Sequence, residues 1–235
     1  MSPLFLALVF AVCALVPVNC QAPDQQDAIA KDLIRNMISN SKPKTLPPTD
    51  GDKPVTVSIG YSLVNVYDLS NKGFSDLTGM LTLSWNDPRL AFSSRALDTD
   101  RLRLPASDIW TPDVELFNTM KPGTKVLIDK PLALVTREGD VTLINTISTR
   151  GHCDVIGQIK SQSFANCTLK FGSWTHSGLD LDMRLQEGGD PLSEFSLTGK
   201  WNVTAASAVR NVQKYACCPE SYIDVTYSYR FQKRN

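Results

Sequence analysis

The chain has 235 residues, and its 24 lysines and arginines balance its 24 aspartates and glutamates. This length suffices for one domain with a sizeable buried core. A neutral chain with neither a basic run nor a basic patch interleaved with aromatic residues does not indicate a nucleic-acid-binding protein.

The N-terminal segment MSPLFLALVFAVCALVPVNC, residues 1–20, predicts a secretory signal peptide. It is a long apolar run without an acidic residue, although the Lys or Arg that usually precedes such a run is missing. We expect cleavage after Cys20, with Ala22 as the alternative. No later stretch approaches the length of about eighteen apolar residues that a membrane span needs. Residues 21–235 are therefore expected to form a soluble, secreted and extracellular domain.

A short helix is predicted over residues 27–40, DAIAKDLIRNMISN. Its apolar side chains recur at helical spacing and share one face, which comprises Ile29, Leu33, Ile34, Met37 and Ile38. The proline-rich segment 41–54 cannot continue this helix and is predicted to be a linker.

From residue 55 the apolar period changes to two. Alternate residues of VTVSIGYSL, 55–63, lie on one side, as in a half-buried strand. A turn at 71–73 leads to a returning strand at 77–85. Further strands are predicted at 124–129, 132–137, 140–149, 167–174, 197–213 and 222–232, with a loop at 186–195. Many short strands separated by turn residues predict an all-β sandwich.

Catalytic groupings are sparse. The two histidines, His152 and His176, belong to no zinc motif, and no nucleophile elbow or phosphate-binding loop occurs. Asp180 and Asp182 would share one face of a strand, where solvated surface is a better interpretation than a general acid and base. We expect no enzyme activity, no cofactor and no metal.

Four cysteines remain once the predicted signal peptide is removed: Cys153, Cys167, Cys217 and Cys218. An even number in an exported chain indicates pairing, and the residues alone leave all three connectivities open. A bond between the adjacent Cys217 and Cys218 would span α-carbons only about 3.8 Å apart. Such a bond closes no long loop, so its use would be to stiffen a turn.

Aromatic residues gather near the predicted loops: Trp110, Phe117, Trp174, Tyr215 and Tyr222. Taken singly, each is best interpreted as core packing. Two tyrosines around a stiffened Cys-Cys turn suggest a second hypothesis, because aromatic faces attract cations, and quaternary ammonium groups are familiar guests.

Four segments carry a family resemblance: LPASDIWTPDVELFN (104–118), CDVIGQIKSQSFANC (153–167), LKFGSWTHSG (169–178) and YACCPESYIDV (215–225). Together, and in this order, they resemble the acetylcholine-binding proteins, the secreted relatives of the extracellular domain of Cys-loop (nicotinic-type) receptors. The resemblance covers about residues 27–235. It implies a ten-stranded, immunoglobulin-like β-sandwich behind an N-terminal helix, and disulfides Cys153–Cys167 and Cys217–Cys218.

The resemblance also implies a ring of five subunits with binding sites between neighbours. The principal face would comprise Phe117, Lys170, Trp174, Tyr215, Cys217, Cys218 and Tyr222, with Lys170 placed to hydrogen-bond a tyrosine of the 215–225 loop. The complementary face would comprise Met80, Leu134, Thr142 and Ile144. Trp85 and Trp110 match positions that pack inside the fold.

Two positions depart from the family pattern. Phe117 stands where a tyrosine is usual, so the ring remains and the hydroxyl is lost. Met80 stands where a tryptophan or tyrosine is usual; its soft sulfur can pack on a ligand but supplies no π face. These departures leave a second hypothesis open, a structural pentamer with a degenerate ligand site.

Two sequons predict N-glycans in a secreted chain, at Asn166 and Asn202. The expected partners are a small acetylcholine-like cation and further subunits, in a homopentamer or in a heteropentamer with a related subunit.

Overall fold

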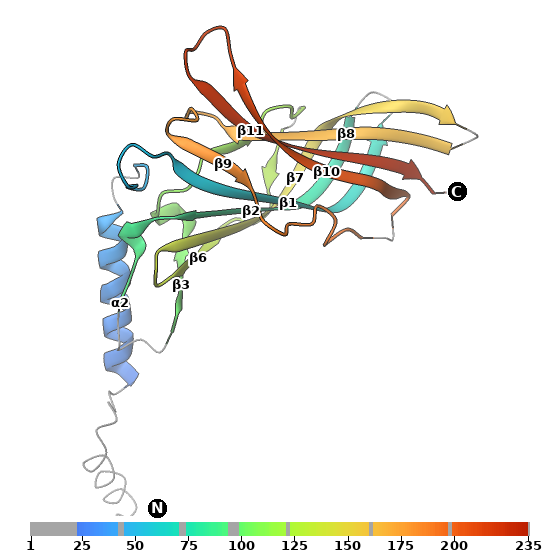
Figure 1. Ribbon diagram of the computed structural model, residues 1–235. Helices are drawn as coiled ribbons and strands as arrows, with labels where there is room; N and C mark the ends of the chain where they lie inside the picture. The colour runs from blue at the N-terminus through green and yellow to red at the C-terminus, as the bar shows by residue number, and fades with distance from the viewer. Residues whose placement is uncertain are drawn as a thin grey trace, which may run out of the picture.

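A computed structural model of the protein describes residues 23–41, 45–70, 74–93, 99–120, 123–159, 162–196 and 199–234. The predicted signal peptide, the turn at 71–73 and part of the linker lie outside these residues. Within them, one α-helix, α2 (Pro23–Asn40), precedes a chain that is built mainly from strands. Figure 1 shows this helix at the periphery of the strands, where its residues Leu33 and Ile34 pack against the core and Met37 is buried.

Eleven strands occur in the described part of the chain: β1 (Val55–Ser70), β2 (Phe74–Asn86), β3 (Arg101–Pro105), β4 (Val114–Leu116), β5 (Lys125–Val126), β6 (Leu132–Thr136), β7 (Asp140–Ile159), β8 (Gln162–Ser173), β9 (Leu181–Leu185), β10 (Trp201–Lys214) and β11 (Ser221–Lys233). Two short 3-10 helices, η1 (Pro88–Leu90) and η2 (Ala106–Asp108), lie between them. The predicted all-β class is confirmed, with eleven strands in place of ten.

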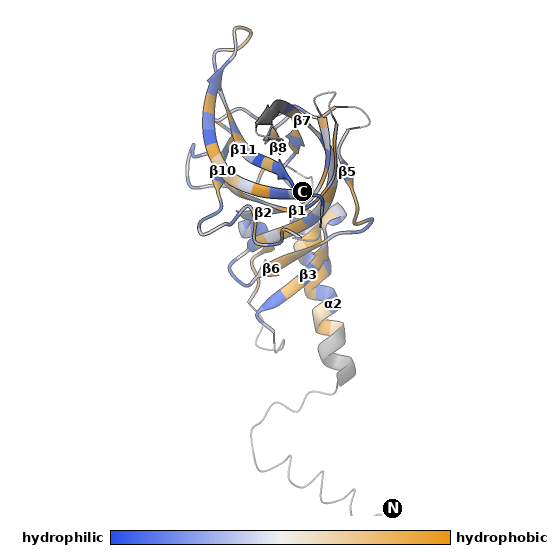
Figure 2. Ribbon diagram, turned by 90° about the vertical axis from the view of Figure 1, so that its right-hand side faces the viewer, coloured by the Kyte–Doolittle hydropathy of each residue, from blue (hydrophilic) through white to orange (hydrophobic). Residues whose placement is uncertain are grey.

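The strands form one hydrogen-bonded path in the order β10-β11-β8-β7-β2-β1-β9. The path curls so that its two ends meet: Arg210 of β10 donates from Nε to the carbonyl of Met183 in β9, at 2.8 Å. Across the interior, the Tyr227 hydroxyl on β11 donates to the Ile59 carbonyl on β1, at 3.1 Å. The curled sheet therefore closes into a sandwich around an apolar core, whose residues alternate with polar ones along the strands (Figure 2).

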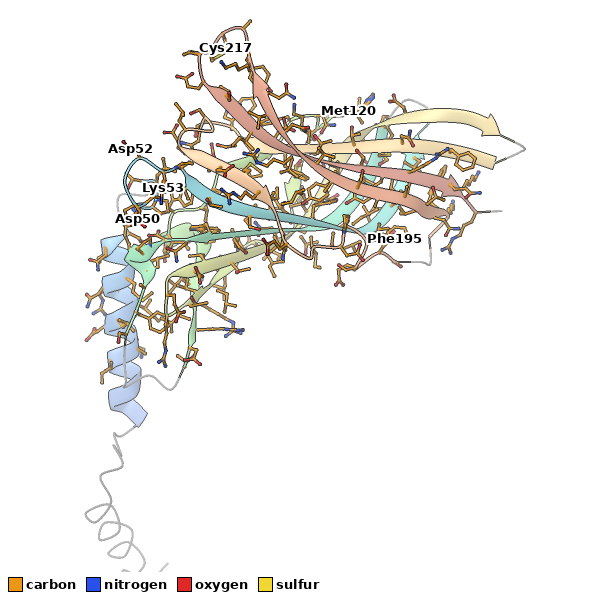
Figure 3. All side chains as sticks on the ribbon, in the orientation of Figure 1. Asp50, Asp52, Lys53, Met120, Phe195 and Cys217 are labelled. Carbon is orange, nitrogen blue, oxygen red and sulfur yellow. A yellow bond between two sulfur atoms is a disulfide. The ribbon has the colours of Figure 1, made fainter. Side chains whose placement is uncertain are left out.

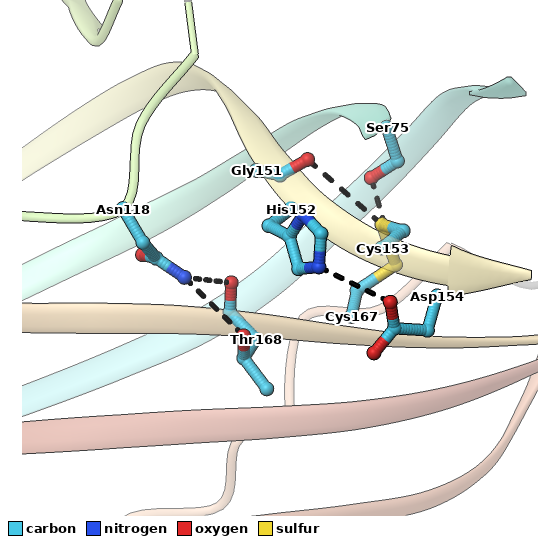
Figure 4. The surroundings of a disulfide bond; sticks show 8 residues. All are labelled: Ser75, Asn118, Gly151, His152, Cys153, Asp154, Cys167 and Thr168. Atoms are coloured by element: carbon cyan, nitrogen blue, oxygen red, sulfur yellow. Dashed lines mark hydrogen bonds and ion pairs between the residues drawn. A yellow bond between two sulfur atoms is a disulfide. The ribbon is translucent and has the colours of Figure 1, made fainter. Parts of the chain in front are cut away.

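The predicted cysteine pairing of the resemblance is confirmed. Cys153 on β7 lies directly opposite Cys167 on β8, and the two form a disulfide in the core, with both residues fully buried. Figure 4 shows this bond next to the exposed pair of His152 and Asp154, whose Nε2 and Oδ1 are 3.1 Å apart. Cys217 and Cys218 form the second disulfide, at the tip of the β10–β11 hairpin (Figure 3).

Four expectations about local structure were wrong. The predicted strand 124–129 is a strand only over Lys125–Val126, and β7 extends ten residues past the predicted end at 149, to Ile159. Asp180 precedes β9, so it does not share a strand with Asp182. Asp182 is not solvated surface either, because its side chain is 13% exposed and forms ion pairs with Arg184 and Arg210.

Candidate functional site

One face of the β8–β11 ladder collects the expected principal residues. Lys170 lies opposite Thr226 and Gly172 opposite Asp224, so the even-numbered residues of β8 share a face with the even-numbered residues of β11. Trp174 directly follows β8 on this alternation. The backbone N–H of Phe117, which follows β4, donates to the Lys170 carbonyl at 2.8 Å. The ring of Phe117 is thereby brought to the same ladder.

Gly172 provides the space for the Phe117 ring. A Cβ built on Gly172 would lie 2.4 Å from Cζ of Phe117, far closer than carbon atoms approach one another. Any side chain at this position would displace the ring. Gly172 is therefore a residue of the site, although it offers no functional group.

Phe117 and Trp174 form the first aromatic pair. Their ring centroids are 6.1 Å apart and the planes meet at 67°, an edge-to-face arrangement. Trp174 is 71% exposed, so the core-packing interpretation was wrong for this residue. It holds for Trp110, which packs edge-to-face against the buried Trp85 at 5.8 Å. An exposed tryptophan held against a second ring leaves its face open to a ligand.

Tyr215 and Tyr222 form the second aromatic pair, on the β10–β11 hairpin that stands out from the sandwich in Figure 1. Their ring centroids are 5.7 Å apart. Tyr222 follows the same even-numbered alternation of β11 as Asp224, so this pair lies on the same face of the ladder as Trp174. The Cys217–Cys218 bond lies between the two tyrosines in the sequence and joins the residues of the tip.

Lys170 forms an ion pair that the sequence did not predict. Its Nζ lies 3.1 Å from Oδ2 of Asp224, whose side chain is only 3% exposed. The other carboxylate oxygen of Asp224 accepts from Asn211 Nδ2 at 2.7 Å and from Thr226 Oγ1 at 3.1 Å. Lys170 is thus paired with a carboxylate of β11 rather than with a tyrosine, and it ties β8 to the base of the hairpin.

Asp113 fixes the backbone that carries Trp174. Its carboxylate accepts hydrogen bonds from Ser173 Oγ at 2.5 Å, Thr175 N at 2.7 Å and Thr175 Oγ1 at 2.6 Å. Its carbonyl accepts from the N–H of Trp174 at 3.1 Å. Burial raises the pKa of Asp113. The hydrogen bonds from Ser173 and Thr175 and the charge of His176 lower the pKa, and together they outweigh burial, so the pKa lies below the usual value of an aspartate.

Replacing Asp113 by asparagine should lower the free energy of unfolding by about 1–3 kcal/mol at neutral pH, because hydrogen bonds to a carboxylate are lost. The folded-state pKa is lowered, so this contribution is complete above the unfolded-state pKa of about 4 and disappears as the pH falls through the folded-state value. Urea unfolding of the parent and Asp113→Asn should therefore give curves that converge in acid. Asp129→Asn, at an exposed position, is the matched control, and an equal loss in both variants would contradict the assignment.

The expected complementary residues lie on a different part of the sheet. Leu134 of β6 is opposite Thr142 of β7, and Ile144 is opposite Thr82 of β2, one alternation from Met80. Met80 is half-buried and Ile144 is 48% exposed. These four residues therefore share a face of the β6-β7-β2 ladder. Among the residues described, no hydrogen bond, ion pair or ring contact joins this face to the principal one.

The sequence missed three residues that shape the principal face: Asp113, Gly172 and Asp224. All three lie within segments that carry the family resemblance, and only Asp113 gave a local signal, the Pro-Asp pair two residues after Trp110. Gly172 and Asp224 gave no signal, because their roles depend on the pairing of β8 with β4 and β11. No group of three or more His, Cys, Asp and Glu in the described ranges could hold a metal ion.

Comparison with known proteins identifies the family to which this chain is similar. The family described as "Neurotransmitter-gated ion-channel ligand binding domain" matches residues 30–235. The chain is 30% identical to the neuronal acetylcholine receptor subunit alpha-10 of Rattus norvegicus, over 98% of this chain and 51% of that protein. It is 28% identical to the acetylcholine receptor subunit alpha-type acr-16 of Caenorhabditis elegans, over 94% of this chain and 44% of that protein. The chain spans about half the length of these relatives.

A solved structure has the same fold. The AChBP of Bulinus truncatus superposes with a TM-score of 0.76 at 23% identity, over 87% of this chain and 98% of that one. No helix in the described ranges has the length and apolar character needed to cross a membrane. With its sandwich, its two disulfides and a match over residues 30–235, the chain belongs to the family of neurotransmitter-gated ion-channel ligand binding domains.

Proposed function

We propose that this chain is a secreted protein that binds acetylcholine or a related cationic amine between the subunits of a pentamer. The observation that carries the proposal is Trp174, which is 71% exposed and held edge-to-face against Phe117, on the face that also bears Tyr215 and Tyr222. Aromatic faces attract a quaternary ammonium group by about 0.5–2 kcal/mol per ring. The two relatives described above are named as acetylcholine receptor subunits.

An exposed apolar patch supports the contribution of a second subunit. It comprises Val126, Leu127, Ile128, Leu132 and Ile144, which are 39–53% exposed. The N–H of Leu127 donates to the Thr146 carbonyl at 2.8 Å, so the segment after β5 lies against the β7 residues next to Ile144. Contiguous apolar surface of this kind is typical of a protein interface. We propose that it packs against the principal face of a neighbouring copy, or of a related subunit in a heteropentamer.

In this assembly Phe117, Lys170, Trp174, Tyr215, Cys217, Cys218 and Tyr222 would form the front of each site, and Met80, Leu134, Thr142 and Ile144 the back. Lys170 acts through its ion pair with Asp224, as a positioning residue. We further propose that residues 1–20 are removed as a signal peptide and that Asn166 and Asn202 carry glycans. Asn166 is exposed on β8, and Asn202 is half-buried at the start of β10, where its Oδ1 accepts from Arg234 Nε at 2.6 Å.

A fluorescence titration tests the proposal directly. The exposed Trp174 should report saturable quenching by acetylcholine, nicotine or an α-neurotoxin, and light scattering should give a mass near five glycosylated chains. A flat response to all three ligands from an intact pentamer would favour the second candidate, a structural pentamer with a degenerate site, which Phe117 and Met80 support. A stable monomer would contradict both candidates, because each is a pentamer and each proposed site combines the principal face of one subunit with the complementary face of its neighbour.

Replacing Met80 by tryptophan should tighten the binding of a quaternary ammonium ligand about two- to thirtyfold, because one more ring is added to the back wall. Met80 is half-buried on the exposed face of β2, so a larger side chain has room toward the neighbouring subunit. Met80→Leu, which adds no π face, is the matched control. The measurement is a titration of both variants with tetramethylammonium. A tryptophan variant that assembles and binds with unchanged affinity would contradict the assignment of Met80 to the back wall.

A further inference from the structure

The β10–β11 hairpin has a second face, opposite the tyrosines. Gln213 is paired with Tyr222, and the next pair along the ladder is Val212 with Ile223. Side chains alternate along a strand, so Val212 and Ile223 point away from the side that bears Tyr222. Figure 1 shows the hairpin standing clear of the sandwich, with the loop before β9 near its base. The residues of this second face have no part in the site described above.

A cavity of about 520 Å³ lies against this second face. Its walls include Leu179, Val212 and Ile223, and its charged lining residues are Arg210, Lys214 and Glu220. None of the seven principal-face residues lines it. Small-molecule sites usually have volumes of about 300–1,000 Å³. The cavity is therefore separate from the aromatic site and large enough for a compact ligand.

The walls of this cavity are held in place from both strands of the hairpin. The N–H of Gly178 donates to the Ser221 carbonyl of β11 at 2.7 Å, and a Cβ on Gly178 would lie only 3.1 Å from that oxygen. On β10, Arg210 Nη2 donates to Asp182 Oδ1 of β9 at 2.6 Å. These contacts fix the hairpin stem to the loop and to β9, so the cavity is formed before any ligand arrives.

The apolar part of the lining faces water. Leu179 is 69% exposed and Val212 is 56% exposed, although both are branched aliphatic side chains. A ligand with an apolar body would remove this surface from water, which is the main favourable contribution to small-molecule binding in a concave site.

The charges of the lining favour an anion. The side chain of Lys214 has no hydrogen-bond or ion-pair partner among the described residues, and Arg210 is the second cation. The partner of Arg210, Asp182, lies outside the lining and is shared with Arg184. Glu220 is the single carboxylate among the lining residues. Two cations and one carboxylate suit a single negative charge.

We propose that this cavity is a second ligand site, which takes a compact amphiphilic monoanion, a carboxylate on an aliphatic body. The carboxylate lies toward Lys214, and the apolar body lies against Leu179, Val212 and Ile223. Glu220 limits the site to one negative charge, because a second would be repelled. The proposal does not rest on cation binding at the aromatic face, since the two sites share no residue.

The test is a calorimetric titration of the intact protein with octanoate, and with octylammonium as the probe of opposite charge. We expect saturable octanoate binding with one site per chain and no comparable binding of octylammonium. Raising the ionic strength should weaken the binding, because Lys214 is exposed.

Four variants locate the site. Lys214→Glu should weaken octanoate binding about fivefold or more, Glu220→Gln should strengthen it about twofold, and Leu179→Glu should abolish it. Lys233→Glu, at the far end of β11, is the matched control and should change nothing. Each substituted side chain is exposed or half-exposed, so the variants should fold, which circular dichroism checks.

Three results would overturn the proposal: no saturable binding of octanoate, equal binding of octylammonium, or octanoate binding that survives both Lys214→Glu and Leu179→Glu. Octanoate binding to the Trp174→Ala variant distinguishes a separate second site from binding at the aromatic face. Octanoate binding that persists in this variant places the anion away from the aromatic face, whereas its loss would place the anion there and refute a second site.

Discussion

Trp174→Ala should lower the affinity for acetylcholine or tetramethylammonium at least about thirtyfold. An aromatic ring at the centre of a binding site, covered once the ligand is bound, contributes about 2 kcal/mol or more to the binding free energy. The free energy of unfolding should stay nearly unchanged, since the side chain is 71% exposed and packs only edge-to-face on Phe117. Fluorescence can no longer report binding in this variant, so calorimetry is the measurement.

The matched control is Leu179→Ala. Leu179 is 69% exposed and lies in the same loop, yet it is on the other side of the hairpin from the tyrosines. The Leu179→Ala substitution should leave the affinity for a cation at the parent value. Trp174→Phe keeps a smaller ring and should fall between the two. A Trp174→Ala variant that binds cations as tightly as the parent would refute the aromatic site, and one that unfolds would restore a packing role for this tryptophan.

Much of the fold could be predicted where the apolar period is long. The face of α2 and the alternation of β1 are each repeated over several turns or pairs, so both elements were found. The short strands β3 (Arg101–Pro105), β4 (Val114–Leu116) and β9 (Leu181–Leu185) were missed, because three to five residues carry too few repeats to establish a period. Their pairing with longer strands, rather than their own sequence, makes them strands.

The site divides in the same way. The rings of Trp174, Tyr215 and Tyr222 were predicted as site residues from the sequence, because the family resemblance assigns all three to the principal face and the two tyrosines flank the Cys-Cys turn. The residues that orient these rings could not be predicted, because each of them acts on a residue of a neighbouring strand. Gly172 is needed only because β4 brings Phe117 over it, and Asp224 is a partner of Lys170 only through the register of β8 with β11. Side-chain chemistry was therefore predictable, whereas the contacts that orient it required the strand pairing.

Removing the buried disulfide with Cys153→Ala/Cys167→Ala should lower the free energy of unfolding by about 3 kcal/mol, because the bond closes a loop of about fifteen residues in the unfolded chain. Both cysteines are fully buried, so alanine is preferred to serine, whose hydroxyl would need a partner. Urea unfolding followed by circular dichroism measures the loss.

The adjacent pair supplies the control for this experiment. Cys217→Ala/Cys218→Ala also removes two cysteines and one disulfide, but that bond joins neighbouring residues and constrains almost none of the unfolded chain. Stability should therefore be unchanged, while the affinity for a cation falls, since the tip between Tyr215 and Tyr222 is no longer stiffened. If the two double variants lose stability equally, loop closure is not the cause, and packing around each sulfur would have to explain both. If only the buried pair affects stability and only the tip pair affects binding, then the two disulfides act separately, one on the unfolded chain and one on the ligand site.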